Sequence, residues 1–246
     1  MHLNNNFHKV FGPKPILGMI HLAGDEPVKR ALEEIEIFEN EGVDGAIVEN
    51  YHGTIEDVLK TLHVLKKREN QLVIGLNVLP NEYQLALPWA FKFGAKFIQL
   101  DYVSGRYVEG ELPSEDYARV KTLFPDIIVL GGAHPKYFTP VVGSNLEEDL
   151  KLGMQRAEAI VVTDQGTGIE TPLDKIMYFR KVLGPHLLIV GAGLTPENAY
   201  EQLIIGNGAI VGTTLKSDND THNKADRYRL RDFMDVVKQA RRYKQQ

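Results

Sequence analysis

The chain has 246 residues, of which 43% are apolar and 25% charged, and its net charge is −5 at neutral pH. This length and apolar content allow one large buried core, and the negative charge argues against non-specific nucleic-acid binding. Without any cysteine the sequence excludes disulfides, thiolate nucleophiles and cysteine-bound iron–sulfur clusters. The N-terminal residues lack the apolar segment of a signal peptide, and no apolar run reaches the ~18 residues of a membrane span, so we expect a cytoplasmic protein.

Short apolar runs recur along the chain and predict eight β-strands. The runs are almost continuously apolar, which is typical of strands that are buried on both faces of a parallel sheet. They cover residues 16–22, 45–50, 72–79, 97–103, 127–133, 159–164, 187–193 and 208–215.

Amphipathic segments follow the strands and predict a helix after each one. The first opens at Pro27 and closes on Gly42, as helices commonly do, and the second begins with Thr54 and Asp57 in a capping pattern. The predicted helices cover residues 26–42, 54–70, 81–94, 113–124, 145–157, 172–183, 196–205 and 225–243.

Eight βα units in this length predict an α/β protein, a single (β/α)8 TIM barrel over residues 1–246 with a short N-terminal extension at 1–14. The alternative is a doubly wound open sheet, which more often has about five or six strands.

Glycine-rich segments follow the seventh and eighth predicted strands, and the corresponding loops of TIM barrels commonly bind phosphate. Glycine lets an anion approach the backbone closely, and Thr195 with Pro196 is a pattern that begins a helix. The alternative is that these glycines only make tight turns. The predicted phosphate-binding residues are Gly191, Gly193, Thr195, Asn198, Gly212, Thr213 and Lys216.

Polar side chains close six of the apolar strands, at the ends where TIM barrels carry catalytic groups. Alternation along the strands indicates that several of them point into the barrel. Each of them is also compatible with a structural role. His21 and Asn77 can bond loop backbone, Glu49 can pair with a charge and Asn50 can cap a turn. Asp101 can pair with Arg106, His134 can belong to a turn before proline, and Asp164 can form an Asx turn. The candidate catalytic residues are His21, Glu49, Asn50, Asn77, Asp101, His134 and Asp164.

An ordered set of motifs resembles the BtpA/SgcQ family over about residues 14–235. The motifs are HL (21–22), GVDGAIVEN (42–50), IGLNVLPN (74–81), GAKFIQLDYVSG (94–105), AEAIVVTDQGTG (157–168), GLTPENAYE (193–201) and GAIVGTTLKSD (208–218). The family is similar to TIM-barrel enzymes such as phosphoribosylanthranilate isomerase. One branch is named for stabilising photosystem I and another lies in sugar-utilisation operons, so the resemblance implies no single reaction. The chain departs from the family pattern at residues 23–27, at Pro80-Asn81 and at Ala133-His134.

These observations favour an enzyme that holds a phosphorylated small molecule, such as a sugar phosphate, and performs acid–base chemistry such as isomerisation. No lysine ends a predicted strand as a Schiff-base group, because Lys136 lies two residues past the fifth. No cofactor is predicted. A divalent metal held by carboxylates and His134 stays open, as do a metal-assisted lyase or hydrolase, a non-catalytic assembly factor of the BtpA type and a homo-oligomer. The long loops at 101–116 and 134–145 are predicted to act as lids.

Overall fold

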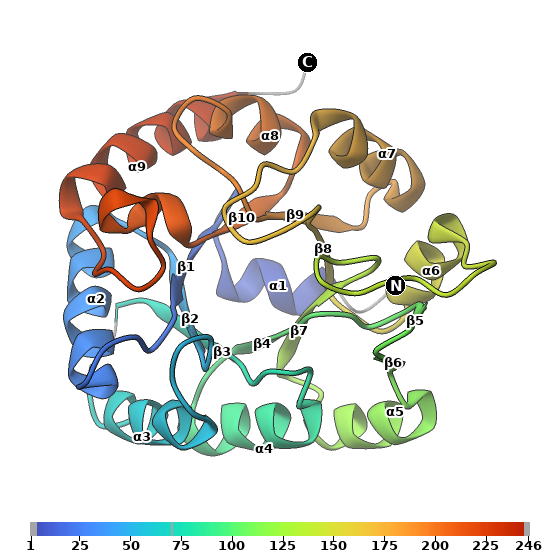
Figure 1. The fold of residues 1–246 in the computed structure, drawn as a ribbon, viewed down its shortest axis with the longest axis horizontal. Coiled ribbons are helices and arrows are strands. Elements are labelled where there is room, and N and C mark those ends of the chain that lie inside the picture. Colours follow the sequence, from blue (N-terminus) through green and yellow to red (C-terminus); the bar gives the residue numbers. More distant parts are fainter. Residues whose placement is uncertain (1–3, 70, 244–246) are drawn as a thin grey trace.

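The computed structural model describes residues 4–69 and 71–243, and at its centre eight parallel strands close into a barrel (Figure 1). Around the barrel the strands follow the order β1, β2, β3, β4, β7, β8, β9, β10, and β10 pairs again with β1. Their bounds are β1 (Ile16–Ile20), β2 (Gly45–Glu49), β3 (Val73–Asn77), β4 (Phe97–Leu100), β7 (Ile128–Gly132), β8 (Ala159–Val162), β9 (Leu187–Gly191) and β10 (Gly208–Val211). The closed ring confirms the predicted TIM barrel and rules out the open sheet.

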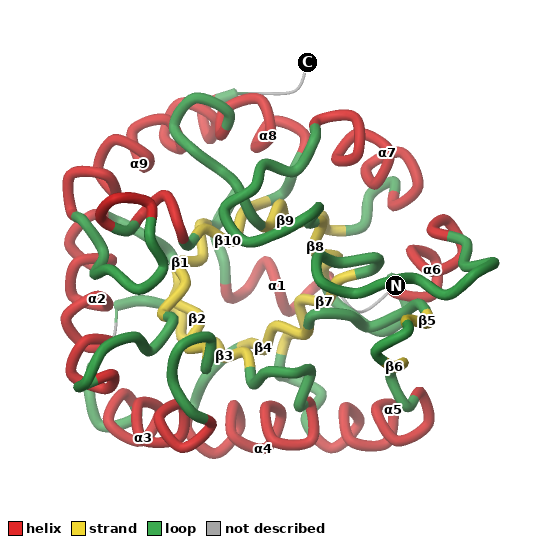
Figure 2. Tube along the Cα trace, in the orientation of Figure 1, coloured by secondary structure: helices red, strands yellow, loops and turns green. Residues whose placement is uncertain are grey.

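Helices surround the strands as an outer ring (Figure 2). They are α2 (Pro27–Glu41), α3 (Ile55–Leu65), α4 (Tyr83–Phe93), α5 (Ser114–Leu123), α6 (Leu146–Gly153), α7 (Leu173–Leu183), α8 (Ala199–Ile205) and α9 (Arg227–Arg242). The helix signals predicted at Gly42 and at Thr54 with Asp57 are confirmed. Gly42 ends α2 with a φ of 79°, and Thr54 and Asp57 form a reciprocal capping box before α3, in which the Asp57 N–H donates to Thr54 Oγ1 over 3.1 Å.

Two apolar layers make up the core. One lies between the strands and the outer helices, and the other fills the barrel interior. The interior layer takes alternate residues from each strand, such as Leu17 and Met19 of β1 or Ile47 of β2. The next residues with the same parity are His21 and Glu49, so the alternation that buries the interior also aims polar groups at the barrel mouth.

The N-terminal extension contains a further helix, α1 (Asn4–Val10), which lies across the end of the barrel opposite the mouth (Figure 1). Its Phe7 and the following Phe11 are 1% and 4% exposed and belong to the barrel-interior layer. The ring of Phe11 packs edge-on against Phe97 at a centroid distance of 5.4 Å. The helix therefore closes the bottom of the barrel with aromatic side chains.

Replacing Phe7 by alanine will lower the free energy of unfolding by about 3–5 kcal/mol, because it opens a cavity under the barrel. Urea unfolding of the purified protein measures this loss. Lys9→Ala, at an exposed position of the same helix, is the matched control and should change the free energy by less than about 0.5 kcal/mol. Equal midpoints for the Phe7 variant and the wild type would show that α1 does not dock in solution.

The two long loops that the sequence predicts as lids pair with each other beside the mouth. A hairpin of β5 (Arg106–Tyr107) and β6 (Gly110–Glu111) lies at the periphery of the ring (Figure 2). The Val108 N–H donates to the Thr139 carbonyl over 2.9 Å, and the Val141 N–H donates to the Arg106 carbonyl over 3.0 Å. With this pairing, Asp101 of the first loop and residues 135–138 of the second line the barrel mouth.

Candidate active site

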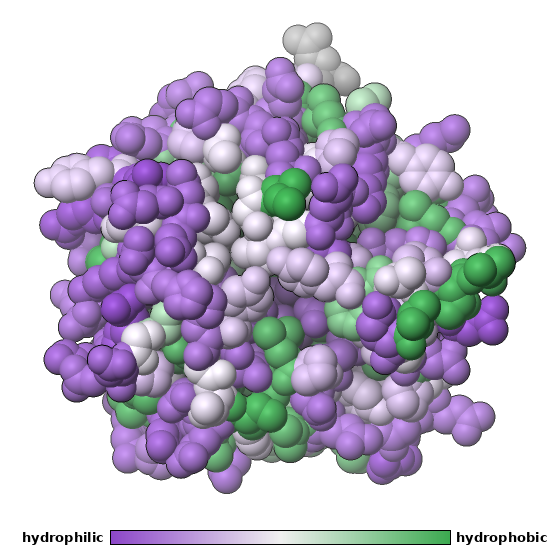
Figure 3. Space-filling view, viewed as in Figure 1, coloured by the Kyte–Doolittle hydropathy of each residue, from purple (hydrophilic) through white to green (hydrophobic). Residues whose placement is uncertain are grey.

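A pocket of about 470 Å³ opens at the carboxyl ends of the barrel strands. The space-filling view down the barrel shows a hollow near the centre of this face (Figure 3). Three predicted catalytic residues line the pocket: His21, Glu49 and Asp101. Five predicted phosphate-binding residues also line it: Gly191, Gly193, Thr195, Gly212 and Thr213. The fold thus gathers groups from both ends of the sequence into one cavity.

Two buried carboxyl groups face each other across an amide at the pocket floor. Asn77 is fully buried and its Nδ2 donates to Glu49 Oε1 over 2.8 Å, while it lies 3.5 Å from Asp101 Oδ1. Burial, together with the nearby Asp101, raises the pKa of Glu49 to about 8. Burial also raises the pKa of Asp101, although Asn77 and Lys136 oppose this shift. A carboxyl that keeps its proton near neutral pH beside a second carboxyl is the arrangement needed for acid–base catalysis.

His21 extends this polar floor on the β1 side. It is 3% exposed, its Nδ1 has no hydrogen-bond partner among the described residues, and the Tyr51 ring lies 5.2 Å away. Burial, reinforced by the positive charge of Lys216, lowers the pKa of His21 well below its usual range. His21 is therefore neutral at physiological pH and can offer either a proton donor or an acceptor to a ligand.

Lys136 also lines the pocket, although the sequence pattern predicts no role for it. Its backbone N–H donates to Thr163 Oγ1 over 2.9 Å, which holds the loop after β7 against the next strand end, and its Nζ donates to Thr167 Oγ1 over 2.7 Å. The ammonium stabilises the ionised forms of Glu49 and Asp101. Its position four residues past the end of β7 concealed it, because the turn that brings it back over the mouth depends on contacts with Thr163 and Thr167.

The two glycine-rich loops form the opposite wall of the pocket. Gly191, Gly193 and Thr195 come from the loop after β9, and Gly212 and Thr213 from the segment after β10. Within the part of the chain that the structure describes, the backbone N–H groups of Thr213 and Thr214 donate to no protein acceptor. Unused N–H groups beside glycines offer hydrogen bonds to an anion.

Comparisons with other proteins identify the family of this chain. The sequence profile of the BtpA family matches residues 13–239. The chain belongs to the BtpA family. It is 29% identical over 260 residues to an uncharacterised protein of Pyrococcus horikoshii, covering 94% of this chain and 98% of that protein. It is 24% identical over 251 residues to the photosystem I biogenesis protein BtpA of Synechocystis, covering 91% of this chain and 88% of that protein.

A solved structure supports the fold of this BtpA-family chain. The phosphoribosyl anthranilate isomerase of Thermococcus kodakaraensis superposes with a TM-score of 0.60 at 17% identity, covering 91% of this chain and 98% of that chain. At such an identity the likeness is one of fold alone. None of the described helices of the BtpA-family chain combines the length and apolar character that a membrane crossing requires. Among its described residues, no group of three or more His, Asp or Glu side chains is placed to hold a metal ion.

Three predicted catalytic residues of the BtpA-family chain point away from the pocket. Asn50 binds the backbone of Leu79, accepting from its N–H over 2.8 Å and donating to its carbonyl over 3.2 Å. Asp164 Oδ1 pairs with Lys175 Nζ at 3.0 Å, and His134 Nε2 lies 2.8 Å from Asp149 Oδ2. These residues hold loops and helices in place, and none of them lines the cavity.

The alternation of strand residues accounts for two of these outcomes. In β2 the inward parity runs through Ile47 to Glu49, and in β8 it runs through Val161 to Thr163. Asn50 and Asp164 therefore have the outward parity. His134 has the inward parity of β7, but its φ of 48° is in the left-handed region and the chain turns there. Its side chain consequently faces Asp149 of α6.

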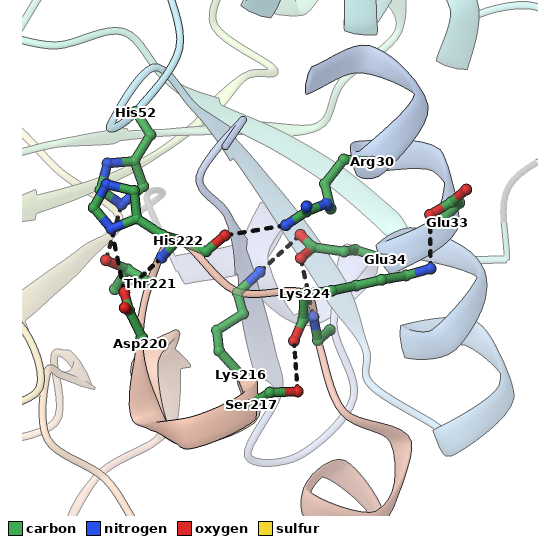
Figure 4. Close-up of polar contacts among 11 residues, drawn as sticks. Arg30, Glu33, Glu34, His52, Lys216, Ser217, Asp220, Thr221, His222 and Lys224 are labelled. Atoms are coloured by element: carbon green, nitrogen blue, oxygen red, sulfur yellow. Dashed lines mark hydrogen bonds and ion pairs between the residues drawn. The ribbon is translucent and has the colours of Figure 1, made fainter. Parts of the chain in front are cut away.

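Two predicted phosphate-binding residues support the loops from behind. Asn198 Oδ1 accepts from the Thr195 N–H over 2.9 Å, and its Nδ2 donates to the Gly193 carbonyl over 3.0 Å. Asn198, not Thr195, directly precedes α8, so the predicted cap at Thr195 is wrong. Lys216 is 1% exposed and its Nζ pairs with Glu34 Oε2 of α2 at 2.7 Å, which directs it out of the barrel (Figure 4). The predicted contact of Lys216 with a phosphate is therefore contradicted.

Replacing Lys216 by methionine will lower the free energy of unfolding by about 3–5 kcal/mol, because it leaves the buried Glu34 carboxylate without its counter-ion. Lys224→Met is the matched control. It breaks the exposed pair of Lys224 with Glu33 on the same helix, which should be worth less than about 1 kcal/mol (Figure 4). Chemical denaturation measures both losses, and a small loss in both variants would contradict a dry ion pair at Lys216.

Proposed function

We propose that this BtpA-family protein is an enzyme that binds a phosphorylated small molecule, such as a sugar phosphate, and moves a proton between neighbouring carbon atoms, as in aldose–ketose isomerisation. The observation that carries the proposal is the convergence of the Glu49–Asn77–Asp101 cluster and the unused N–H groups of Thr213 and Thr214 on one pocket. A phosphate anchored at the loops after β9 and β10 would orient the remainder of the ligand over the carboxyl pair.

Three of the ionisable groups that line the pocket, Asp101, Glu49 and Lys136, each have a role in this reaction. Asp101 takes the proton from the carbon next to the carbonyl, since Asn77 and Lys136 favour its ionised form. Glu49 keeps its proton near neutral pH and gives it to the carbonyl oxygen. The ammonium of Lys136 opposes the negative charge that develops on the enediol intermediate. Asp101 then gives its proton to the former carbonyl carbon, while Glu49 takes the proton of the neighbouring hydroxyl, which becomes the new carbonyl, so both groups return to their starting protonation states.

The proposal is tested by binding and by isotope exchange. Inorganic phosphate and a panel of triose, pentose and hexose phosphates should raise the melting temperature, because a ligand that binds only the folded state stabilises it. In D2O the wild type should place deuterium on the carbon next to the carbonyl of the sugar phosphate that binds, and Asp101→Asn should not. A panel in which no phosphorylated compound stabilises the protein would overturn the proposal.

A non-catalytic assembly role is the second candidate, and an exposed apolar ridge favours it. Val108 and Val142 are 73% and 103% exposed on the paired loops beside the mouth, and the Synechocystis relative carries the name of a biogenesis protein. Replacing both valines by lysine should leave ligand binding intact. Both variants are then tested for restoring growth to cells that lack the protein. If the double variant fails to restore growth while Asp101→Asn restores it fully, the assembly role is favoured over catalysis.

A further inference from the structure

One side of the pocket is apolar and is not used by the proton transfers proposed above. Leu79 and Pro80 come from the loop after β3, and Phe138 from the loop after β7. Their side chains have no hydrogen-bonding group, so they can contribute only by covering apolar surface of a ligand. A small sugar phosphate is hydroxylated along its whole length and would leave this surface against water.

Two tyrosine rings complete the apolar side. Tyr51, after β2, and Tyr137, after β7, line the pocket, and both hydroxyls meet Thr167 of the loop after β8. The Tyr51 hydroxyl donates to Thr167 Oγ1 over 3.4 Å, and the Tyr137 hydroxyl accepts from the Thr167 N–H over 2.9 Å. Since β2 and β8 are four strands apart around the ring of eight, these contacts span the mouth. With their hydroxyls engaged, the tyrosines offer a ligand mainly their ring surfaces.

We propose that the ligand is a phosphorylated sugar that also carries a flat, unsaturated ring, which lies against the apolar side formed by the two tyrosine rings with Leu79, Pro80 and Phe138. The proposal rests on the proposed function, because the phosphate at the loops after β9 and β10 fixes the direction in which the sugar points. Flat rings gain affinity from aromatic stacking whatever their polar substituents. Aryl ribosides and nucleosides that carry a 5-phosphate combine these two features and serve as non-reacting binding probes, because their substituted anomeric carbon offers no carbonyl for the proposed proton transfers.

A matched series of ligands separates the ring from the phosphate. Dissociation constants are measured by calorimetry for inorganic phosphate, ribose 5-phosphate, phenyl riboside 5-phosphate and uridine 5′-monophosphate. We expect at least one ring-bearing compound to bind about 10-fold more tightly than ribose 5-phosphate. The phenyl and uracil compounds distinguish an aryl group from a nucleobase as the source of the ring. Equal affinities for all three sugar phosphates overturn the ring proposal and leave the proposed function standing, whereas no binding of any phosphate compound overturns both.

Variants of Tyr51 test the contact itself. Tyr51→Leu removes the ring and should reduce the about 10-fold preference for ring-bearing ligands to less than about 3-fold, with ribose 5-phosphate binding unchanged. Tyr51→Phe keeps the ring, loses only the bond to Thr167 and should retain the preference. Leu79→Ser, at a partly exposed position of the same apolar side, should act as Tyr51→Leu does. Ribose 5-phosphate binding reports on the fold of each variant, and an unchanged preference in both Tyr51→Leu and Leu79→Ser would overturn the proposal.

Discussion

Glu49→Gln will abolish turnover of the substrate while the protein stays folded, with a loss of about 10²–10⁴-fold in kcat. Glutamine preserves the size of the side chain and an oxygen that can accept from Asn77 Nδ2. It cannot give up a proton, however, and proton donation is the role assigned to Glu49. Single-turnover assays and circular dichroism of the variant measure the two quantities. Full activity in Glu49→Gln would move the acid to another group.

The raised pKa of Glu49 predicts that both the activity and the stability of the wild type depend on pH. Since burial raises the pKa of Glu49 to about 8, wild-type activity should fall as the pH rises through 8, where the acid loses its proton. A carboxyl whose pKa is raised by folding stabilises the native state below its unfolded pKa and loses this contribution as the pH rises through the folded pKa. Wild-type stability should therefore decline between about pH 4.5 and 8 relative to Glu49→Gln. Parallel pH profiles of the two proteins in thermal unfolding would contradict the raised pKa.

The two glycine-rich loops should respond differently to substitution. Gly212 lines the pocket, and a side chain there would first meet the ring of His21, with Cβ 3.0 Å from its Cε1. Gly212→Val should therefore weaken binding of inorganic phosphate by about 10-fold or more, because it fills the space that the anion needs. The loss in the free energy of unfolding should be smaller than the loss in the free energy of phosphate binding. Phosphate titration and urea unfolding of the same variant measure both effects.

Gly193→Ala is the contrasting variant. Gly193 has a φ of 69°, and an added Cβ would lie 2.3 Å from backbone atoms of Glu170. Backbone atoms cannot move aside as a flexible side chain can, so this change should lower the free energy of unfolding by several kcal/mol. If Gly212→Val loses stability and phosphate binding in equal measure, that glycine is structural as well, and the anion site must be sought elsewhere in the pocket.

Tertiary contacts decided which candidate residues share the pocket. The strand pattern assigns Lys136 no role because no strand ends at it, yet Thr163 and Thr167 bring it to the mouth. Lys216 ends a glycine-rich loop and would suit an anion, but Glu34, 182 positions earlier in the chain, holds it behind the barrel wall. The sequence contains no local signal for such a pairing, because the partner is distant in the chain and becomes a neighbour only when α2 packs against β1 and β1 pairs with β10, the strand that precedes Lys216.

The sequence by itself determined the barrel, the order of its elements and three strand ends, at His21, Glu49 and Asp101, that line the pocket. It could do so because apolar periodicity and helix-terminal residues act over a few positions, whereas Asn50 is predicted beside Glu49 although alternation gives it the outward parity. Only the tertiary structure decided that α1 closes the bottom of the barrel, that the long loops pair with each other, and that a side chain added at Gly193 would meet backbone atoms while one at Gly212 would meet His21. These features depend on contacts between segments far apart in the chain. The energies of such contacts are set by packing in three dimensions, and no local sequence pattern encodes them.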